Sequence, residues 1–276
     1  MLHSQSEQLN HRGNELFSRG HYTEAYRCYI RALECDRRSG NRRVLVATLG
    51  NLGNICAVSG RREQAQAYYE EVLKLQKVLG DERGIGTTLA NLGNLRADSG
   101  EWERARAYYL EAQDIMERAK DDAGRAVLYS DLGLVARETG NCEEALRYYE
   151  HSLALMRRIG NQAGMADAWR MMARTFALQD RYEEGVSCCH TSLAIAERLG
   201  DELRVAGAWY LMAHCYEQQG RLKEAADLLE QVVRVDRKYG LPKLEENTRR
   251  LEAIRTRLSG ANQPQSYQPG REEMRA

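Results

Sequence analysis

Apolar side chains recur along this chain at the spacing of helices, and the helices themselves recur every 40 residues. Leu9, Leu16 and Phe17 have helical apolar spacing near the start of the chain. A second helix, expected over 22–38, carries a small residue and an aromatic one on the same face. This pair is Ala25/Tyr29, and later periods repeat it at Ala65/Tyr69, Ala105/Tyr109 and Ala145/Tyr149. A fixed period of this length predicts an array of stacked helix pairs.

Glycines mark the expected helix ends. One series lies at the turn inside each pair, and Asp180 takes the place of glycine in its fifth member: Gly20, Gly60, Gly100, Gly140, Gly220. A second series closes each pair, with Lys120 in its third place: Gly40, Gly80, Gly160, Gly200, Gly240. We expect left-handed residues at these positions. Asn41, Asp81, Asn161 and Asp201 follow the second series, and we expect them to cap the next helix.

A third series of small residues falls inside the first helix of each pair. It comprises Gly13, Gly53, Gly93, Gly133, Ala173 and Ala213. A glycine inside a helix is less favourable than alanine by about 1 kcal/mol. We therefore expect a neighbouring helix backbone to approach closely at these positions.

These motifs together resemble the tetratricopeptide repeat. The chain has a leucine–glycine pair, a turn glycine seven residues later, then alanine five and an aromatic residue nine beyond that. The 40-residue form is similar to the repeats of Pins/LGN-type polarity adaptors, kinesin light chains and bacterial signalling scaffolds. The resemblance implies an all-α, right-handed superhelical solenoid of six helix-turn-helix units. We place these units at about 5–40, 41–80, 81–120, 121–160, 161–200 and 201–240, and the fit is weakest in the fifth.

The end of the chain breaks the pattern. Pro242 fits the first turn of a helix, and we expect a capping helix over about 242–258 with Leu244, Leu251, Ile254 and Leu258 on one face. Its other face is highly charged, as expected where a terminal helix covers the last repeat and faces water. The array would thus span 1–258. Residues 259–276 contain two of the three prolines and few apolar residues, and we predict a disordered tail.

In the resembling family, the first helix of each pair lines a concave groove that binds peptides. The resemblance places eleven candidate residues there: Asn10, Asn14, Asn51, Asn54, Asn91, Asn94, Arg137, Arg170, Arg174, Tyr210 and His214. Asparagine can donate and accept, so the first repeats can bond a peptide backbone. Arginines beside apolar residues in the later repeats suit carboxylates and hydrophobic anchors. The predicted ligand is an extended or helical acidic and apolar segment of another protein.

Two other interpretations of these residues remain at this point. The asparagines are also consistent with solvated helix surface, or with hydrogen bonds to a neighbouring repeat. Arg170 and Arg174 are also consistent with internal pairing to Asp131 or Asp167. The tyrosine pairs and Trp102, Trp169 and Trp209 are interpreted as packing residues.

Composition limits the function classes. Lys and Arg total 40, as do Asp and Glu, so the net charge is zero, whereas a nucleic-acid binder would carry a basic excess. The seven cysteines show no CxxC spacing and the six histidines no metal-ligand spacing. We therefore expect free thiols, no metal and no cofactor. No signal peptide or membrane span is expected, which favours a cytoplasmic protein.

No catalytic motif is present, so we predict a non-enzymatic scaffold or adaptor that binds a protein segment. The alternatives are a self-associating or constitutive structural subunit, and a regulatory subunit of a separately encoded enzyme.

Overall fold

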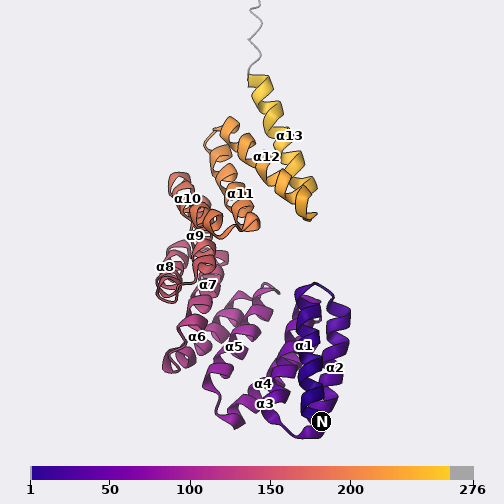
Figure 1. Ribbon diagram of the computed structural model, residues 1–276. Helices are drawn as coiled ribbons and strands as arrows, with labels where there is room; N and C mark the ends of the chain where they lie inside the picture. Colours follow the sequence, from indigo (N-terminus) through magenta and orange to yellow (C-terminus); the bar gives the residue numbers. More distant parts are fainter. Residues whose placement is uncertain (1, 262–276) are drawn as a thin grey trace, which may run out of the picture. The chain divides into compact units, whose positions relative to one another are not determined.

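A computed structural model describes residues 2–261, with side chains from residue 5 to residue 259. This part of the chain contains thirteen α-helices and no strand (Figure 1). The first eight are α1 Leu2–Ser18, α2 Tyr22–Ser39, α3 Arg42–Val58, α4 Arg62–Leu79, α5 Glu82–Ala97, α6 Trp102–Arg118, α7 Asp122–Glu138 and α8 Cys142–Arg158. The others are α9 Gln162–Leu178, α10 Tyr182–Leu199, α11 Glu202–Gln218, α12 Leu222–Tyr239 and α13 Leu244–Ala261. The prediction of an all-α fold built from helix pairs is confirmed.

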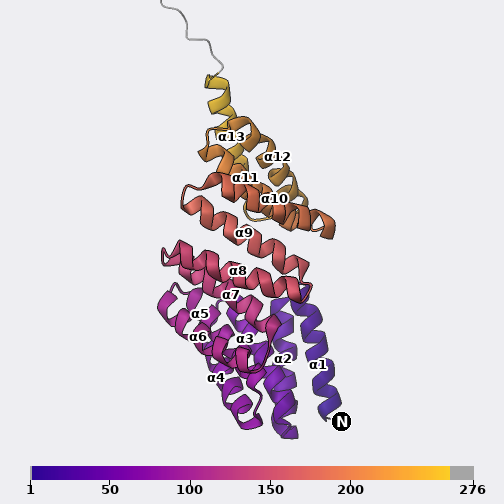
Figure 2. The same ribbon diagram turned by 90° about the vertical axis from the view of Figure 1, so that its left-hand side faces the viewer.

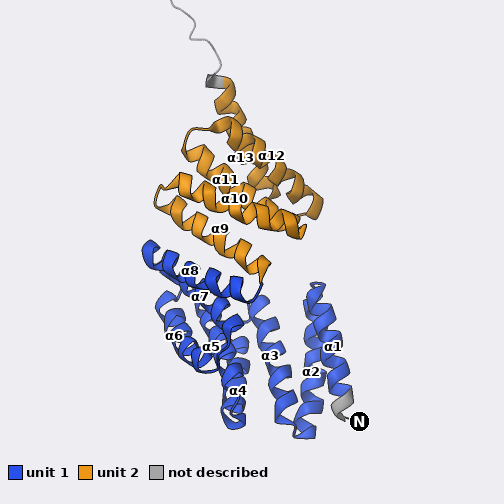
Figure 3. Ribbon diagram, turned by 60° about the vertical axis from the view of Figure 1, so that its left-hand side comes forward, with its two compact units in different colours: residues 1–160 blue, residues 161–276 orange. Residues whose placement is uncertain are grey.

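The chain divides into two compact units, coloured separately in Figure 3. Unit 1, residues 1–160, contains α1–α8, and unit 2, residues 161–276, contains α9–α13. Within each unit, consecutive odd and even helices pack side by side as hairpins, which both ribbon views show (Figures 1 and 2). Unit 1 therefore holds the first four predicted repeats, and unit 2 holds the last two with the final helix.

The helix ends follow the predicted turn chemistry. The turn glycines adopt positive φ, as Gly60 does at +72°, and Lys120 and Asp180 adopt +52° and +58° in the same register. The predicted caps also form: the Asn161 side chain accepts from the Gly164 amide at the start of α9. The equivalent side chains at the starts of α3, α5, α7 and α11 are Asn41, Asp81, Asp121 and Asp201.

The mid-helix glycines make room for a tyrosine ring, and not for a helix backbone as expected. A Cβ atom on Gly53 would lie 2.4 Å from Cε1 of Tyr69, which is 3 % exposed. The same overlap occurs at Gly13/Tyr29, Gly93/Tyr109 and Gly133/Tyr149. In unit 2 the partners change together, to Ala173 with Cys189 and Ala213 with Leu229, and all four are fully buried. A larger residue on the first helix thus accompanies a smaller one on the second.

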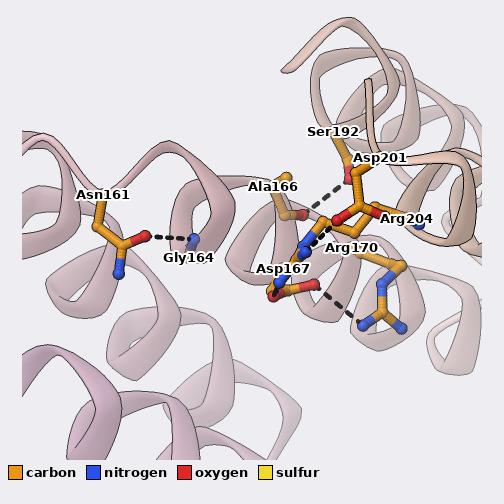
Figure 4. Close-up of polar contacts among 8 residues, drawn as sticks. All are labelled: Asn161, Gly164, Ala166, Asp167, Arg170, Ser192, Asp201 and Arg204. Carbon is orange, nitrogen blue, oxygen red and sulfur yellow. Dashed lines mark hydrogen bonds and ion pairs between the residues drawn. The ribbon is translucent and has the colours of Figure 1, made fainter. Parts of the chain in front are cut away.

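Buried polar contacts join neighbouring helices within each unit, between successive pairs in unit 1 and inside the pair α9–α10 in unit 2. The Thr48 hydroxyl donates to Asp36 at 2.6 Å between α2 and α3, and Thr88 donates to Gln76 at 2.8 Å between α4 and α5. In unit 2 the Ser192 hydroxyl donates to the Ala166 carbonyl (Figure 4). These bonds fix the height at which one helix packs on the next, because a slip would leave buried groups unpaired.

The last helix covers α12 through apolar and polar contacts. Leu251 and Ile254 are buried, and Asn247 donates to Asp236 at 2.7 Å. Helix α13 runs to Ala261, so residues 259–261 are helical. The remainder of the predicted tail, 262–276, lies outside the described residues. No helix in the described part is long and apolar enough to cross a bilayer.

Candidate functional site

Three of the candidate asparagines have a packing role. In unit 1 the hydroxyl of Tyr69 donates to Oδ1 of Asn54 at 2.8 Å. Tyr29 and Asn14 repeat this bond at 2.7 Å, and Tyr109 and Asn94 at 2.5 Å. Each of these asparagines is exposed, and its Nδ2 has no partner among the described residues. One end of the amide therefore holds the tyrosine, and only the other end faces outward.

The other three asparagines differ along unit 1. Asn10 donates to the Thr48 hydroxyl at 2.7 Å and accepts from Nδ2 of Asn51 at 3.3 Å. Asn91 forms no hydrogen bond with the described residues. The candidate asparagines Asn10 and Asn51 are thus bonded within the chain, whereas Asn91 on α5 is more available to a ligand.

In unit 2, an acidic residue holds two arginines. Asp167 on α9 lies 3.4 Å from a guanidinium nitrogen of Arg170, and Arg204 on α11 donates to it at 2.9 Å (Figure 4). Arg204 also pairs with Asp201. The internal pairing considered for Arg170 therefore occurs, with Asp167 on the same helix, and Arg204 joins α9 to α11 through the same carboxylate.

Arg174 differs from Arg170 although it lies one turn away on α9. Its guanidinium is exposed and has no acidic partner among the described residues. It faces a cavity of about 280 Å³ between α9, α11 and the start of α13. The lining residues are Arg170, Arg174, Ala177, Leu178, Gly207, Tyr210, Leu211, His214 and Lys243. The structure thus brings together four of the candidate residues, namely Arg170, Arg174, Tyr210 and His214.

Residues near the last helix complete the charge of this cavity. Lys243 lies 5.5 Å from the centre of the Tyr210 ring, and Arg250 on α13 lies 5.3 Å from it. Arg250 is neutralised by Glu217, at 2.8 Å, whereas Lys243 has no acidic partner in the described part of the chain. Arg174 and Lys243 therefore give the cavity a net positive charge.

The pKa of His214 responds to this excess of positive charge. Burial lowers the pKa of His214 below its usual value, Arg250 and Arg174 lower it further, and Glu217 partly opposes them. A neutral imidazole is therefore favoured while the cavity is empty of anions. Bringing a carboxylate beside Arg174 would offset the positive field and raise the pKa of His214.

Arg137 does not join this cavity. It lies on α7 in unit 1, is 5 % exposed and donates to Glu138 at 2.7 Å. Sequence reasoning missed Lys243 and Arg250. The sequence signal that could have found them is their place at or near the final helix, which must cover the last helix pair.

The described residues give little support to thiol or metal chemistry. All seven cysteines are free thiols, and burial raises the pKa of Cys188 and of Cys215 to about 11, which keeps both protonated. Among residues 2–261, no group of three or more His, Cys, Asp or Glu side chains is placed to hold a metal ion.

Comparisons with known proteins identify the repeat. The tetratricopeptide repeat family model matches residues 7–77, 84–158 and 164–238. A Rap protein in complex with competence and sporulation factor has a TM-score of 0.68 at 15 % identity, over 93 % of this chain and 76 % of that one. The apo quorum sensor NprR from B. thuringiensis gives 0.68 at 14 % identity, over 92 % and 77 %.

A third structure contains nearly identical TPR-like repeats of a putative kinesin light chain from Podosopora anserina. Its TM-score is 0.60 at 19 % identity, over 71 % of this chain and 96 % of that one. No curated protein matches the sequence. At these identities the structural likeness concerns the fold alone.

Proposed function

Because the chain belongs to the tetratricopeptide repeat family, we propose that it is a non-enzymatic protein-interaction module. The cavity between α9 and α11 binds an acidic and apolar segment of a partner protein. The observation that carries this proposal is that one cavity combines an apolar wall with two cations that have no acidic partner among the described residues. Arg174 and Lys243 supply the charge, and Leu178 is 60 % exposed beside them.

The cavity suits a carboxylate for a geometric reason. Arg174 presents a planar fork of donors, which matches two carboxylate oxygens, while Lys243, just before α13, adds a single charge. Arg170 is paired with Asp167 and therefore forms a fixed part of the cavity wall. A Glu or Asp side chain of the partner would sit between these groups.

The apolar part of the ligand follows from the remaining lining. Tyr210 is half-buried, and Leu211 and Ala177 are buried at the base of the cavity. At about 280 Å³ the cavity is slightly smaller than small-molecule sites, which hold about 300–1,000 Å³. It suits one or two side chains of a peptide. A Leu or Phe next to the acidic residue is the anchor we expect.

A peptide selection on the full chain tests this function. Random peptides displayed on phage are selected against the protein, and we expect enrichment of Asp or Glu beside Leu or Phe. Binding of a selected synthetic peptide is then measured by fluorescence anisotropy. Arg174→Glu should weaken it at least about tenfold, since a hydrogen bond to a charged group contributes about 1.5–3 kcal/mol.

The matched control is Arg198→Glu, an equal charge change at an exposed residue of α10 outside the cavity. It should leave the affinity within about twofold. Titration of His214 by NMR gives a second readout, because a bound acidic peptide should raise the pKa of that imidazole. Selected peptides without acidic enrichment, or equal losses in the two variants, would refute the proposal.

A further inference from the structure

The chain itself carries a segment whose composition suits the unit 2 cavity. Residues 262–276 follow α13 and belong to the same unit as the cavity. Their only acidic residues, Glu272 and Glu273, directly precede their only large aliphatic residue, Met274. An acidic side chain close to an apolar one is the ligand chemistry that the cavity suits. Unit 2 therefore contains both a candidate site and a candidate ligand for it.

The segment is long enough to reach the cavity. Lys243, which lines the cavity, directly precedes α13, and that helix runs to Ala261. At 1.5 Å per residue its 18 residues span about 27 Å. An extended chain covers about 3.3 Å per residue, so the stretch from Ala261 to Glu272 can cover about 36 Å. This length is enough to return along the whole of α13.

The order of charges in the segment suits the cavity if the segment binds in an extended form. Successive side chains of an extended chain point to opposite sides. In such a chain Glu272 and Met274 share one side, and the other side carries Arg271, Glu273 and Arg275. The first side offers one negative charge and one apolar group to the positive cavity. Both arginines point away from it.

We propose that residues 272–274 bind in the unit 2 cavity of the same molecule and compete there with the partner protein. Glu272 pairs with Arg174, and Met274 packs on Leu178, which is 60 % exposed at the cavity wall. Methionine suits this wall because its unbranched side chain adapts to irregular apolar surfaces. The inference rests on the proposed function, since it assigns a second ligand to the same cavity.

The tether makes a weak contact effective. A ligand on a short flexible linker has an effective concentration of about 1 mM. At a dissociation constant of about 0.1 mM for the free segment, the tethered segment occupies the cavity about nine-tenths of the time and weakens a competing peptide about tenfold. The full chain therefore binds a partner less tightly than the empty cavity would, and a ligand of higher affinity displaces the segment.

A competition experiment on the full chain tests the proposal, with the selected acidic peptide as the probe. Fluorescence anisotropy gives its affinity for the wild type, Glu272→Gln and Glu273→Gln. We expect Glu272→Gln to bind the peptide about five- to tenfold more tightly, because the segment loses a bond to a charged group and competes less. Glu273→Gln, an equal charge change at the next residue, is the matched control and should stay within about twofold of the wild type. No gain in Glu272→Gln, or equal gains in both variants, would overturn the proposal.

The imidazole of His214 gives a readout without any added peptide. A carboxylate beside Arg174 raises the pKa of His214, so NMR titration should give a lower pKa in Glu272→Gln than in the wild type. Met274→Ser should lower it as well, although this change removes no charge, because the segment loses its apolar anchor. The same His214 pKa in the wild type and in both variants would contradict binding of the segment.

Dilution distinguishes binding within one molecule from binding between two copies of the chain. Binding within one molecule predicts a monomer by light scattering at every concentration, and a pKa of His214 that does not change on dilution. A dimer that Glu272→Gln dissociates would place the segment in the cavity of a second copy. That result would overturn the assignment to the same molecule.

The outcome is separable from that of the proposed function when peptide selection is repeated on Glu272→Gln. If selected acidic peptides bind the wild type and Glu272→Gln equally, and Arg174→Glu weakens them, only the inference about the segment fails. If neither selection enriches acidic peptides while the pKa of His214 falls in Glu272→Gln, only the function proposed for a partner protein fails.

Discussion

Replacing Gly53 with alanine tests the packing between the two helices of a pair. The new Cβ would lie 2.4 Å from Cε1 and 2.7 Å from Cδ1 of Tyr69, whereas carbon atoms pack well at about 3.5–4.0 Å. The ring is 3 % exposed and its hydroxyl is bonded to Asn54, so it cannot move aside without losing that bond. Overpacking of this kind lowers stability by about 1–3 kcal/mol.

The intrinsic helix preference of alanine opposes this loss. Alanine is more favourable than glycine inside a helix by about 1 kcal/mol, so the net loss for Gly53→Ala should be about 1–2 kcal/mol. Gly50 supplies the control, because it lies on the same helix and a Cβ there has nothing within 4 Å. Gly50→Ala should gain up to about 1 kcal/mol. The two variants should therefore differ in sign.

Urea unfolding of the full chain, followed by circular dichroism, measures both free energies. A double variant, Gly53→Ala with Tyr69→Leu, carries the small pair that Ala213 and Leu229 form in the sixth repeat. It should lose less stability than the sum of its two single variants, because the added methyl group fills space that the ring vacates. Equal stabilisation by Gly50→Ala and Gly53→Ala would refute the reasoning.

Two further changes test buried polar groups. Asp131→Asn should raise the free energy of unfolding at pH 8 and change it little at pH 4. Burial raises the pKa of Asp131 in the folded protein from 3.8 to about 7. The wild type therefore loses stability as the pH rises between these two values, by up to about 4 kcal/mol. Parallel pH profiles of stability for the wild type and Asp131→Asn would contradict this. Asn247→Ala leaves the buried Asp236 without its donor and should lower stability by about 1–3 kcal/mol in urea unfolding. Thr248→Ala, which loses only a bond within α13, is its control, and equal losses would contradict the role of Asn247.

Much of the fold could be predicted because local and periodic signals coincide. The positive φ of Gly60 and the cap at Asn161 follow from residue type and position alone. The reason for Gly53 was not predictable in the same way, because a glycine inside a helix indicates a close approach without naming the approaching group. The signal was nevertheless present, since glycine on the first helix accompanies tyrosine on the second in four repeats.

The candidate site was predictable only where the repeat register extends. Arg170, Arg174, Tyr210 and His214 occupy equivalent places in neighbouring repeats, and they line one cavity. Lys243 lies beyond the last repeat, where the 40-residue register gives no position for it. The pairing of Arg170 with Asp167 depends on side-chain geometry, which the sequence leaves open.

The bond between Asn54 and Tyr69 affects how homologous sequences should be compared. Selection for a stable fold is enough to preserve Asn14, Asn54 and Asn94, because each holds a tyrosine hydroxyl in place. Invariance of these asparagines among relatives would therefore be no sign of a shared ligand. Divergence of ligand preference should instead be sought at positions that hold no tyrosine hydroxyl in place, such as Ala90 and Asp131. Two homologues that differ there can keep the same architecture and yet recognise different partners.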